Sequence, residues 1–396
     1  MGGVSSATST WGSSGLAYLT GLPGGPPDFS RANVLWHAQR VATAVGERLG
    51  VAIDAADLLA GRAALLGLTR GGRVSAGGAT RLLTAADGWC AITLSRPDDA
   101  AAVPALVQSD DVGADPWPAV RHWAATHHRS AVVERAALLD IPAAALSEAA
   151  AAAPRIRPWG ARGPARDVGG LLVADLSSMW AGPLCGQLLA RAGATVVKVE
   201  SPRRPDGTRA GNQAFFHWMN GEKLSYCVDF DTNADELHEL LAVADIVIEG
   251  SRPAALTRRR LGPHDIEPRQ GRIWLRITGY DGARPGFGDD AAVAGGLVGV
   301  AADGPVFCAD AIADPLTGLE ATRLVADSLC RGGGELIEVA MAAVAAGYAA
   351  LPTQASVSNR TAPPPRVPQA ARRSARLGAD HEAVRRIVAE RSCRRC

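Results

Sequence analysis

The stretch LLVADLSSMWAGPLCGQLLARAGATVVKVESP, residues 171–202, constrains the fold more than any other part of the chain. Its pattern predicts a buried strand, a small-residue turn with proline at a helix start, a short helix and a second strand, at 173–176, 181–183, 184–192 and 194–200. A strand, a crossover helix and a second strand form the opening βαβ unit of a parallel sheet. The glycines at 182, 186 and 193 do not make the GxGxxG spacing of a dinucleotide site.

The rest of the C-terminal half continues this alternation. Strands are expected near 171–175, 194–199, 224–229, 245–249, 272–278 and 335–339, and helices near 183–192, 233–243, 253–261, 315–330 and 340–350. Strands that alternate with helices predict an α/β fold with a doubly wound parallel sheet.

The N-terminal half is richer in helix. Helical periodicity appears at 32–49, 55–67, 115–127, 130–139 and 143–152, and one strand is expected at Trp89–Ser95. We therefore divide the chain into a helix-rich part at 1–150, a Pro, Gly and Arg-rich linker at 151–169, an α/β domain at 170–354, and a Pro/Arg-rich strap at 355–396 with a last helix near 380–391.

Composition limits the possible partners. Of the 396 residues, 47% are hydrophobic and 20% charged, which is enough for sizeable cores, and the net charge of +1 gives no global attraction for nucleic acid or an anionic membrane. No membrane span is expected, because no window approaches about eighteen uninterrupted apolar residues. The seven cysteines make no disulfide framework, which favours a cytoplasmic protein, and we assign no metal or redox role to Cys393 and Cys396 in the basic tail.

An internal echo links the two halves. GLAYLTGLPGGPP, which begins at Gly15, can be laid against GLVGVAADGP, which begins at Gly296, and a helix start follows in both places. In this register Asn33 occupies the position of Asp314. The match is short and biased in composition, so duplication and chance similarity both stay open.

Ordered sequence blocks resemble a known family, the class III CoA transferases, which include carnitine-CoA transferase, formyl-CoA transferase and 2-methylacyl-CoA racemase. The blocks are the 171–202 stretch, PDGTR at 205–209, FFHWMNGEKLSYCVDF at 215–230, ADIVIEGSRPAAL at 244–256, RRLG at 259–262, ITGY at 277–280 and ADPLTG at 313–318. The resemblance implies a Rossmann-like fold and coenzyme A or acyl-CoA as substrate, with no bound prosthetic group. The segment TAADGWCAI, from Thr84, is similar to a strand that normally follows these blocks, so the chain resembles a rearranged member.

The resemblance implies that Asp314 is a covalent nucleophile. A carboxylate that attacks an acyl-CoA thioester forms a mixed anhydride, and the released CoA converts the anhydride to an aspartyl-CoA thioester. A position at or beside a helix N-terminus favours the ionised carboxylate, although Asp314 would sit there equally well as a plain helix cap. Asp310, four residues earlier, is expected to be exposed to solvent.

Coenzyme A carries phosphate groups, so its pocket needs local cations. The CoA-binding candidates are Arg209, Lys223, Arg252 and Arg260, together with Trp180 as a wall of the pantetheine channel. Each cation lies in or beside a family-like block, near the predicted carboxyl end of a strand, where open α/β sheets bind ligands. A solvated surface charge is the alternative for any one of them.

The predicted activity is transfer of CoA between an acyl-CoA and a free carboxylic acid, in a homodimer favoured by the large apolar fraction. One alternative is a family member that binds CoA without catalysis. A racemase is the other, but it needs a histidine after Tyr280, where this chain has Asp289 and Asp290. Gly71–Gly78 is either a loop that shields the intermediate from water or a flexible linker.

Overall fold

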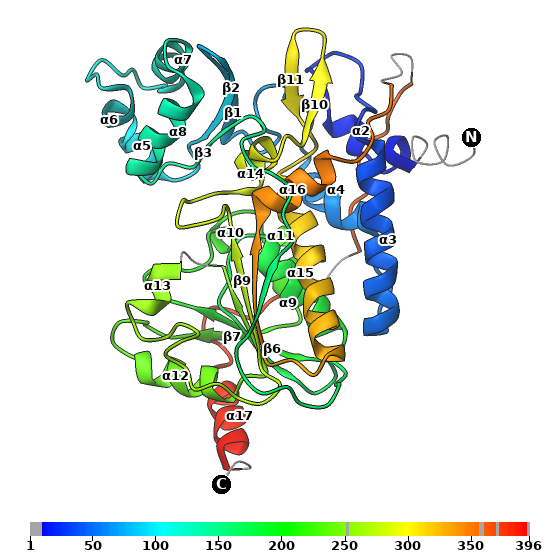
Figure 1. Cartoon of the computed structure of the whole chain (residues 1–396), viewed down its shortest axis with the longest axis vertical. Helices are drawn as coiled ribbons and strands as arrows, with labels where there is room; N and C mark the ends of the chain where they lie inside the picture. The colour runs from blue at the N-terminus through cyan, green and yellow to red at the C-terminus, as the bar shows by residue number, and fades with distance from the viewer. Residues whose placement is uncertain (1–9, 251–252, 356–359, 370–371, 394–396) are drawn as a thin grey trace.

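A computed structural model describes residues 10–250, 253–355, 360–369 and 372–393. Its centre is a seven-stranded sheet in the order β4-β12-β9-β8-β5-β6-β7 (Figure 1). Its strands are β4 (Arg155–Pro158), β5 (Leu172–Asp175), β6 (Thr195–Glu200), β7 (Leu224–Cys227), β8 (Ile246–Glu249), β9 (Ile273–Thr278) and β12 (Glu335–Ala340). All neighbouring pairs are parallel except β4 with β12.

Apolar side chains cover both faces of this sheet. Val173 of β5 belongs to a core shared with α9 (Ala181–Arg191) and α15 (Ala313–Cys330). Its neighbours Leu172 and Ala174 belong to a second core, with α12 (Ala234–Val243) and α17 (His381–Cys393). Successive side chains of a strand point to opposite faces, so a strand buried on both sides is apolar throughout. The predicted doubly wound α/β sheet is confirmed.

The remaining elements of the C-terminal half are short. They are α10 (Gly207–Ala210), α11 (Gln213–Asn220), α13 (Pro253–Thr257), α14 (Gly288–Ala294), α16 (Met341–Ala349), and the hairpin of β10 (Val298–Ala301) and β11 (Gly304–Phe307). No helix in the described ranges is both long and apolar enough to cross a membrane.

The N-terminal half contributes to two cores. Helices α2 (Leu16–Leu19), α3 (Ala32–Leu49) and α4 (Ala55–Leu66) join the same core as α9 and α15, and α3 packs along α15 (Figure 1). The three-stranded antiparallel sheet of β1 (Thr80–Ala85), β2 (Gly88–Thr93) and β3 (Ala143–Ala145) has its own core, with α6 (Val103–Val107), α7 (Trp117–Ala125) and α8 (Arg129–Leu138). The short helix α5 (Pro97–Ala101) leads into α6.

Two sequence predictions are wrong in detail. The helix expected at 143–152 is absent, and its first three residues form β3, which pairs with β2 and is buried. Alanine is the strongest helix former, but helix propensity is a weak determinant and tertiary packing overrides it here. The expected linker at 151–169 contains the edge strand β4, whose side chains are all exposed. Such a strand carries no hydrophobic period, because only its backbone is paired with the sheet.

The C-terminal strap crosses the N-terminal half before it reaches α17. A Cβ added to Gly15 would lie 2.3 Å from Pro365, and one added to Gly61 would lie 3.2 Å from Pro368. Further along, the His217 side chain is hydrogen-bonded to Ser374 at 2.9 Å. The helix predicted near 380–391 is present as α17. Cys393 is its last residue, and Cys396 lies outside the described residues.

Candidate active site

The site lies where the strand order of the sheet reverses direction. The chain runs from β5 to β6 and β7 on one side, and then returns to β8 on the other side of β5. Open α/β sheets bind ligands at the carboxyl ends of the strands at this point. Here the loop after β5 is tied to β8, because Leu176 donates its backbone N–H to Ile248 at 2.9 Å. Ser178 and Met179 at the tip of this loop are exposed to solvent.

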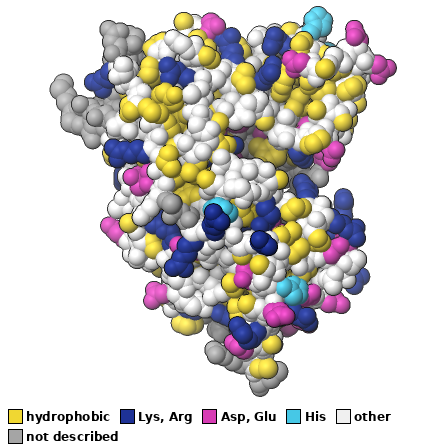
Figure 2. Space-filling model, turned by 180° about the vertical axis from the view of Figure 1, so that it is seen from behind, with side chains coloured by type: hydrophobic (Ala, Val, Ile, Leu, Met, Phe, Trp, Pro, Cys, Tyr) yellow, Lys and Arg dark blue, Asp and Glu magenta, His cyan; other side chains and the backbone are white. Residues whose placement is uncertain are grey.

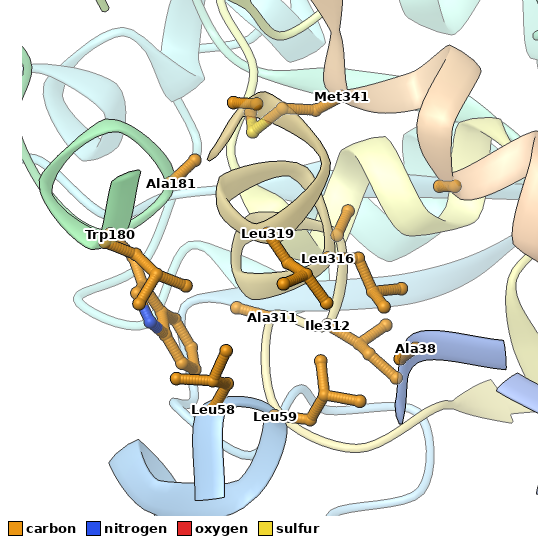
Figure 3. Close-up of a cluster of buried hydrophobic side chains, with 14 of the residues drawn as sticks. Ala38, Leu58, Leu59, Trp180, Ala181, Ala311, Ile312, Leu316, Leu319 and Met341 are labelled. Atoms are coloured by element: carbon orange, nitrogen blue, oxygen red, sulfur yellow. The ribbon is translucent and has the colours of Figure 1, made fainter. Parts of the chain in front are cut away.

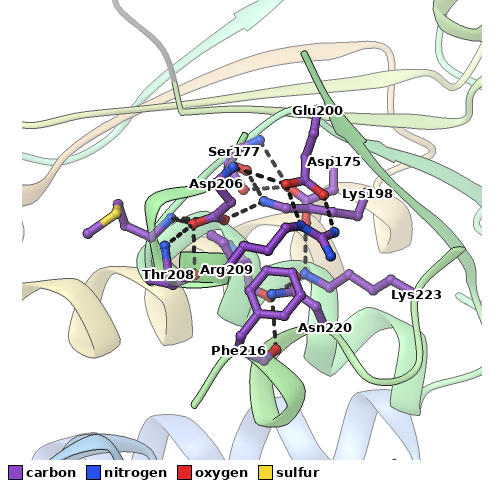
Figure 4. Close-up of polar contacts among 12 residues, drawn as sticks. Asp175, Ser177, Lys198, Glu200, Asp206, Thr208, Arg209, Phe216, Asn220 and Lys223 are labelled. Atoms are coloured by element: carbon purple, nitrogen blue, oxygen red, sulfur yellow. Dashed lines mark hydrogen bonds and ion pairs between the residues drawn. The ribbon is translucent and has the colours of Figure 1, made fainter. Parts of the chain in front are cut away.

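Two buried ion pairs hold this loop in place (Figure 4). Lys223 Nζ lies 2.7 Å from the Asp175 carboxylate, and Lys198 Nζ lies 2.7 Å from the Asp206 carboxylate. Lys198 also donates to the backbone carbonyl of Ser177. Burial alone raises the pKa of Asp175, but Lys223 and Lys198 outweigh it and bring that pKa below its ordinary value. Each charge is paired inside the fold, and the Lys198 contact to the Ser177 carbonyl ties the loop to these pairs.

These contacts involve two of the predicted CoA-binding residues, Lys223 and Arg209. Lys223 is buried, with a side chain only 1% exposed, so its expected position facing a ligand is wrong. Arg209 is paired with Glu200, donates to the carbonyl of Ala375, and lies with Cζ 4.3 Å from the Phe216 ring centroid. A sequence shows that a cation is present, but not whether an internal carboxylate already neutralises it.

Two of the other three CoA-binding candidates lie within the described residues. Arg260 is exposed on the segment after α13, and Arg252 lies outside the described residues. Trp180 is 2% exposed and meets Phe215 edge to face, with ring centroids 5.4 Å apart. Figure 3 shows Trp180 beside Leu58 of α4, across from the segment that leads into α15. Trp180 therefore lies where the two halves of the chain meet.

Asp314 is the second residue of α15 and is half-buried. Its Oδ2 accepts a hydrogen bond from the backbone N–H of Gly288 at 3.1 Å. The expected position beside a helix start is confirmed, although Ile312, and not Asp314, is the N-cap residue. The first turn of a helix favours negative charge, so the location suits a reactive carboxylate.

Asp310 is not exposed as predicted, but fully buried. One of its oxygens lies 2.6 Å from Nη1 of Arg62, a residue of α4. The error has a physical cause: α4 of the N-terminal half covers the segment before α15, and nothing in the sequence of the C-terminal half reveals that cover.

Two more carboxylates come from α14. Asp289 accepts a hydrogen bond from the backbone N–H of Ala311 at 3.0 Å. Asp290 is buried and accepts from the Tyr280 hydroxyl at 2.5 Å, from the Thr93 hydroxyl at 3.2 Å and from the Phe287 backbone at 2.9 Å. We call Asp289, Asp290, Asp310 and Asp314 the carboxylate cluster. Within the described ranges, no group of His, Cys, Asp and Glu side chains is arranged to hold a metal ion.

Burial sets the protonation of this cluster. It raises the pKa of Asp314 to about 7, an effect that Arg62 opposes and that Asp289 and Asp290 increase. It also raises the pKa of Asp289 to about 7 and that of Asp290 to about 6. A carboxyl group with a pKa near neutrality can serve as a nucleophile and can also carry a proton.

Polar atoms around the cluster have unused hydrogen-bonding capacity. The indole nitrogen of Trp180, Oδ2 of Asp310 and the hydroxyl of Thr317 are buried and have no hydrogen-bond partner in the described part of the chain. Buried polar atoms are normally satisfied, so an unpartnered group indicates a place for a bound molecule or water. All three belong to segments that meet at the start of α15.

The glycine-rich segment Gly71–Gly78 also reaches the cluster. A Cβ on Gly77 would lie 3.4 Å from Nη2 of Arg62 and 4.0 Å from Oδ1 of Asp310. Thr80, just after this segment, lies 3.4 Å from Asp289. Sequence reasoning missed Arg62, because a single arginine in a mostly apolar helix gives no signal of its own.

The internal echo agrees with the structure in register. Helices α3 and α15 are both 18 residues long, and Asn33 and Asp314 are their second residues. The Asn33 amide donates to the carbonyl of Pro352 at 2.6 Å and accepts from Gln354 at 3.1 Å, so it is bonded to the strap and not to the carboxylate cluster.

The α/β fold agrees with one family of known proteins. The sequence model of CoA-transferase family III matches residues 168–379, more than half of the chain, and the chain belongs to this family. The resemblance seen in the sequence blocks is thereby confirmed.

Individual relatives cover only part of the chain. A probable fatty acyl-CoA transferase of Mycobacterium tuberculosis is 34% identical over 137 residues, which make up 31% of this chain and 34% of that protein. The succinate–glutarate CoA-transferase of Agrobacterium fabrum is 29% identical over 201 residues, which make up 43% of this chain and 50% of that protein. A crystal structure of a hypothetical protein from M. tuberculosis is 32% identical, with a TM-score of 0.43, and covers 47% of this chain and 56% of that one. The chain thus spans between a third and a half of the length of these two curated relatives.

Proposed function

We propose that this protein transfers CoA between an acyl-CoA and a free carboxylic acid, with Asp314 as the covalent nucleophile. The observation that carries the proposal is the place of Asp314: a half-buried carboxylate in the first turn of α15, bonded to the Gly288 N–H, with unpartnered polar atoms on Asp310 and Thr317 of the same segment. Relatives that match part of the chain are named as CoA-transferases. Their names support the class of reaction and not a particular donor or acceptor.

The chemistry follows from a carboxylate meeting a thioester. Asp314 attacks the acyl carbon, the C–S bond breaks, and a mixed anhydride and the CoA thiolate form. The thiolate then attacks the Asp314 carbonyl carbon, which releases the first acid and leaves an aspartyl-CoA thioester. A second carboxylate attacks this thioester, and the same two steps run in reverse to give the new acyl-CoA and free Asp314.

Water would hydrolyse the anhydride, so the site must exclude it. We propose the segment Gly71–Gly78 as the shield, because Gly77 lies against Arg62 and Asp310. The alternative, a flexible linker, predicts that this segment makes no difference to hydrolysis. Replacing Gly77 by valine should raise the ratio of acyl-CoA hydrolysis to transfer if the segment closes over the site.

Coenzyme A would enter past the exposed tip of the β5 loop at Ser178 and Met179. Figure 2 shows the back face of the molecule hollowed where its upper and lower parts meet, with Lys and Arg side chains gathered on the lower part. Arg260 and Arg252 remain our candidates for the phosphate groups. Arg209 and Trp180 would act by shaping the walls of the path, since their polar or aromatic faces are already engaged.

The decisive experiment is covalent trapping. The protein is incubated with a panel of acyl-CoA donors and free acids, treated with hydroxylamine or borohydride, and digested for mass analysis. A mass change at Asp314 that is lost in Asp314→Asn is expected. Asp111→Asn, at an exposed carboxylate in the loop between α6 and α7, is the matched control.

The alternatives predict other outcomes. CoA binding without an adduct would favour a non-catalytic CoA-binding protein. Exchange of the α-hydrogen of an acyl-CoA into deuterated water without transfer would favour a racemase, with Asp289 and Asp314 as its acid and base. Transfer that persists in Asp314→Asn would overturn the assignment.

We further propose a cytoplasmic homodimer. The odd cysteine count without a disulfide framework supports the reducing compartment, and the large apolar fraction supports association. Sedimentation equilibrium of the full chain measures the oligomeric state, and a monomer at micromolar concentration would contradict the dimer.

A further inference from the structure

Arg62 connects the N-terminal half to the carboxylate cluster. It belongs to α4, whose first turn is capped by the Asp54 carboxylate. Its Cζ lies 5.5 Å from the ring centroid of Trp180 and 5.7 Å from that of Phe215, while Nη1 reaches Asp310 at 2.6 Å. Two aromatic faces and one carboxylate therefore fix the guanidinium, which is still 23% exposed.

The four carboxylates of the cluster outnumber the cations that pair with them. Among the described residues, Arg62 is the only cation that forms an ion pair with a member of the carboxylate cluster. The loop that holds Asp310 is in turn bonded to α14, because the Ala311 N–H donates to Asp289 and the Gly288 N–H donates to Asp314. Within this bonded group the charge of Arg62 opposes the rise that burial causes in the pKa of Asp289 and of Asp314. A buried carboxylate without a nearby cation holds its proton, and a protonated carboxyl group is a poor nucleophile.

We infer that Arg62 is a positioning residue that keeps Asp314 ionised for attack, with Asp310 competing for the same guanidinium. This inference rests on the function proposed above. Arg62 lies outside the residues matched by the family model, so the N-terminal half supplies a part of the machinery that the matched region lacks. Arg62 and Asp310 have opposite effects on the ionisation of Asp314. The Arg62 guanidinium stabilises the Asp314 carboxylate, and Asp310 weakens this effect because its own negative charge pairs with the guanidinium.

The test compares the pH dependence of adduct formation in matched variants. Arg62→Gln should move the acid limb of the pH–rate profile up by about one pH unit, the lower end of the shift that loss of a neighbouring opposite charge causes at a carboxyl group. Because the pKa of Asp314 is about 7, this shift should lower the trapping rate at pH 7 about fivefold. Arg62→Lys keeps the charge and should restore most of the wild-type profile. Asp310→Asn frees the guanidinium and should move the limb down. The control is Arg40→Gln, which removes a guanidinium that lies over the exposed Trp36.

Opposite shifts in Arg62→Gln and Asp310→Asn, with unchanged KM for the acid and the acyl-CoA, are expected. The inference would be overturned if the acid limb of the pH–rate profile does not move, whether or not KM rises. It would also be overturned if the limb moves in the same direction in both variants. If Arg62→Gln does not fold, Asp310→Asn and Arg62→Lys still decide it. A wild-type protein that forms no adduct removes the proposed function as well, whereas a wild-type adduct with unmoved limbs removes this inference alone.

Discussion

Gly288 and Asp314 are in direct contact: the Gly288 N–H donates to Asp314 Oδ2, and a Cβ at residue 288 would lie 2.3 Å from that same oxygen. The same Cβ would lie 2.4 Å from the carbonyl oxygen of Ala311. The start of α14 therefore fits the carboxylate only because residue 288 has no side chain. This contact orients the proposed nucleophile as well as bonding to it.

Gly288→Ala should displace the Asp314 carboxylate and lower the rate of covalent trapping by about 100-fold, since a displacement of about 1 Å can cost that much. Gly347→Ala is the matched control, because Gly347 lies on an exposed face of α16 with no atom within 4 Å of an added Cβ. That change should leave trapping unchanged and stabilise the helix by about 1 kcal/mol. Wild-type trapping in Gly288→Ala would show that this contact does not orient the nucleophile.

The rate of adduct formation should depend on pH near neutrality. Burial raises the pKa of Asp314 to about 7, and the nucleophile is the ionised form, so the rate should rise with pH through about 7. Asp289→Asn removes a like charge and should move this rise to lower pH. Single-turnover trapping across the range measures both profiles, and a rise centred near the ordinary aspartate value of 3.8 in the wild type would contradict the prediction.

The same carboxylates should make folding stability depend on pH. Asp289 has an ordinary pKa of 3.8 and a folded pKa raised to about 7, so the folded state binds more protons between these values. Its favourable contribution is complete below 3.8 and is lost as pH rises through about 7. Asp289→Asn should therefore be more stable than wild type at about pH 8, with the difference closing toward about pH 4. Urea unfolding at both pH values checks this, and a pH-independent difference would contradict it.

The Asp175–Lys223 pair gives a prediction about stability alone. Lys223→Met leaves the buried Asp175 carboxylate without its main partner and should lower the free energy of unfolding by about 3–5 kcal/mol. The double variant Lys223→Met/Asp175→Asn removes both charges and should recover part of that loss. Urea unfolding measures both variants, and additive losses in the double variant would show that the pair is not coupled.

The fold could be predicted because the sheet is buried on both faces. Strands such as β5 and β8 are short apolar runs between helices with clear periodicity, and few architectures besides a parallel α/β sheet produce this pattern. The edge strand β4 and the alanine strand β3 could not be predicted. Partners distant in sequence fix both of them, and their own residues favour other conformations.

The site could be predicted only in part. Asp314 is marked by its motif and its helix start, both of which are local. Arg62 lies 248 residues from Asp310 in the chain, so only the packing of α4 reveals their pairing. Lys223 shows the opposite kind of error. Its place in a family-like block suggested a ligand-facing cation, but it is buried and neutralises Asp175 inside the fold.

The hydrophobic core shared by the two halves has a practical consequence for dissecting this protein. It runs from Trp11 through Leu59 to Leu316 and Tyr348, so neither half alone can bury the residues that it contributes to this core. A chain cut at the exposed residues 151–153 would give two insoluble fragments when they are produced separately. Produced together, they should reassemble, and Arg62 on one fragment would again face Asp310 on the other. The two halves are in this sense complementary fragments, and the segment after residue 150 keeps them on one chain.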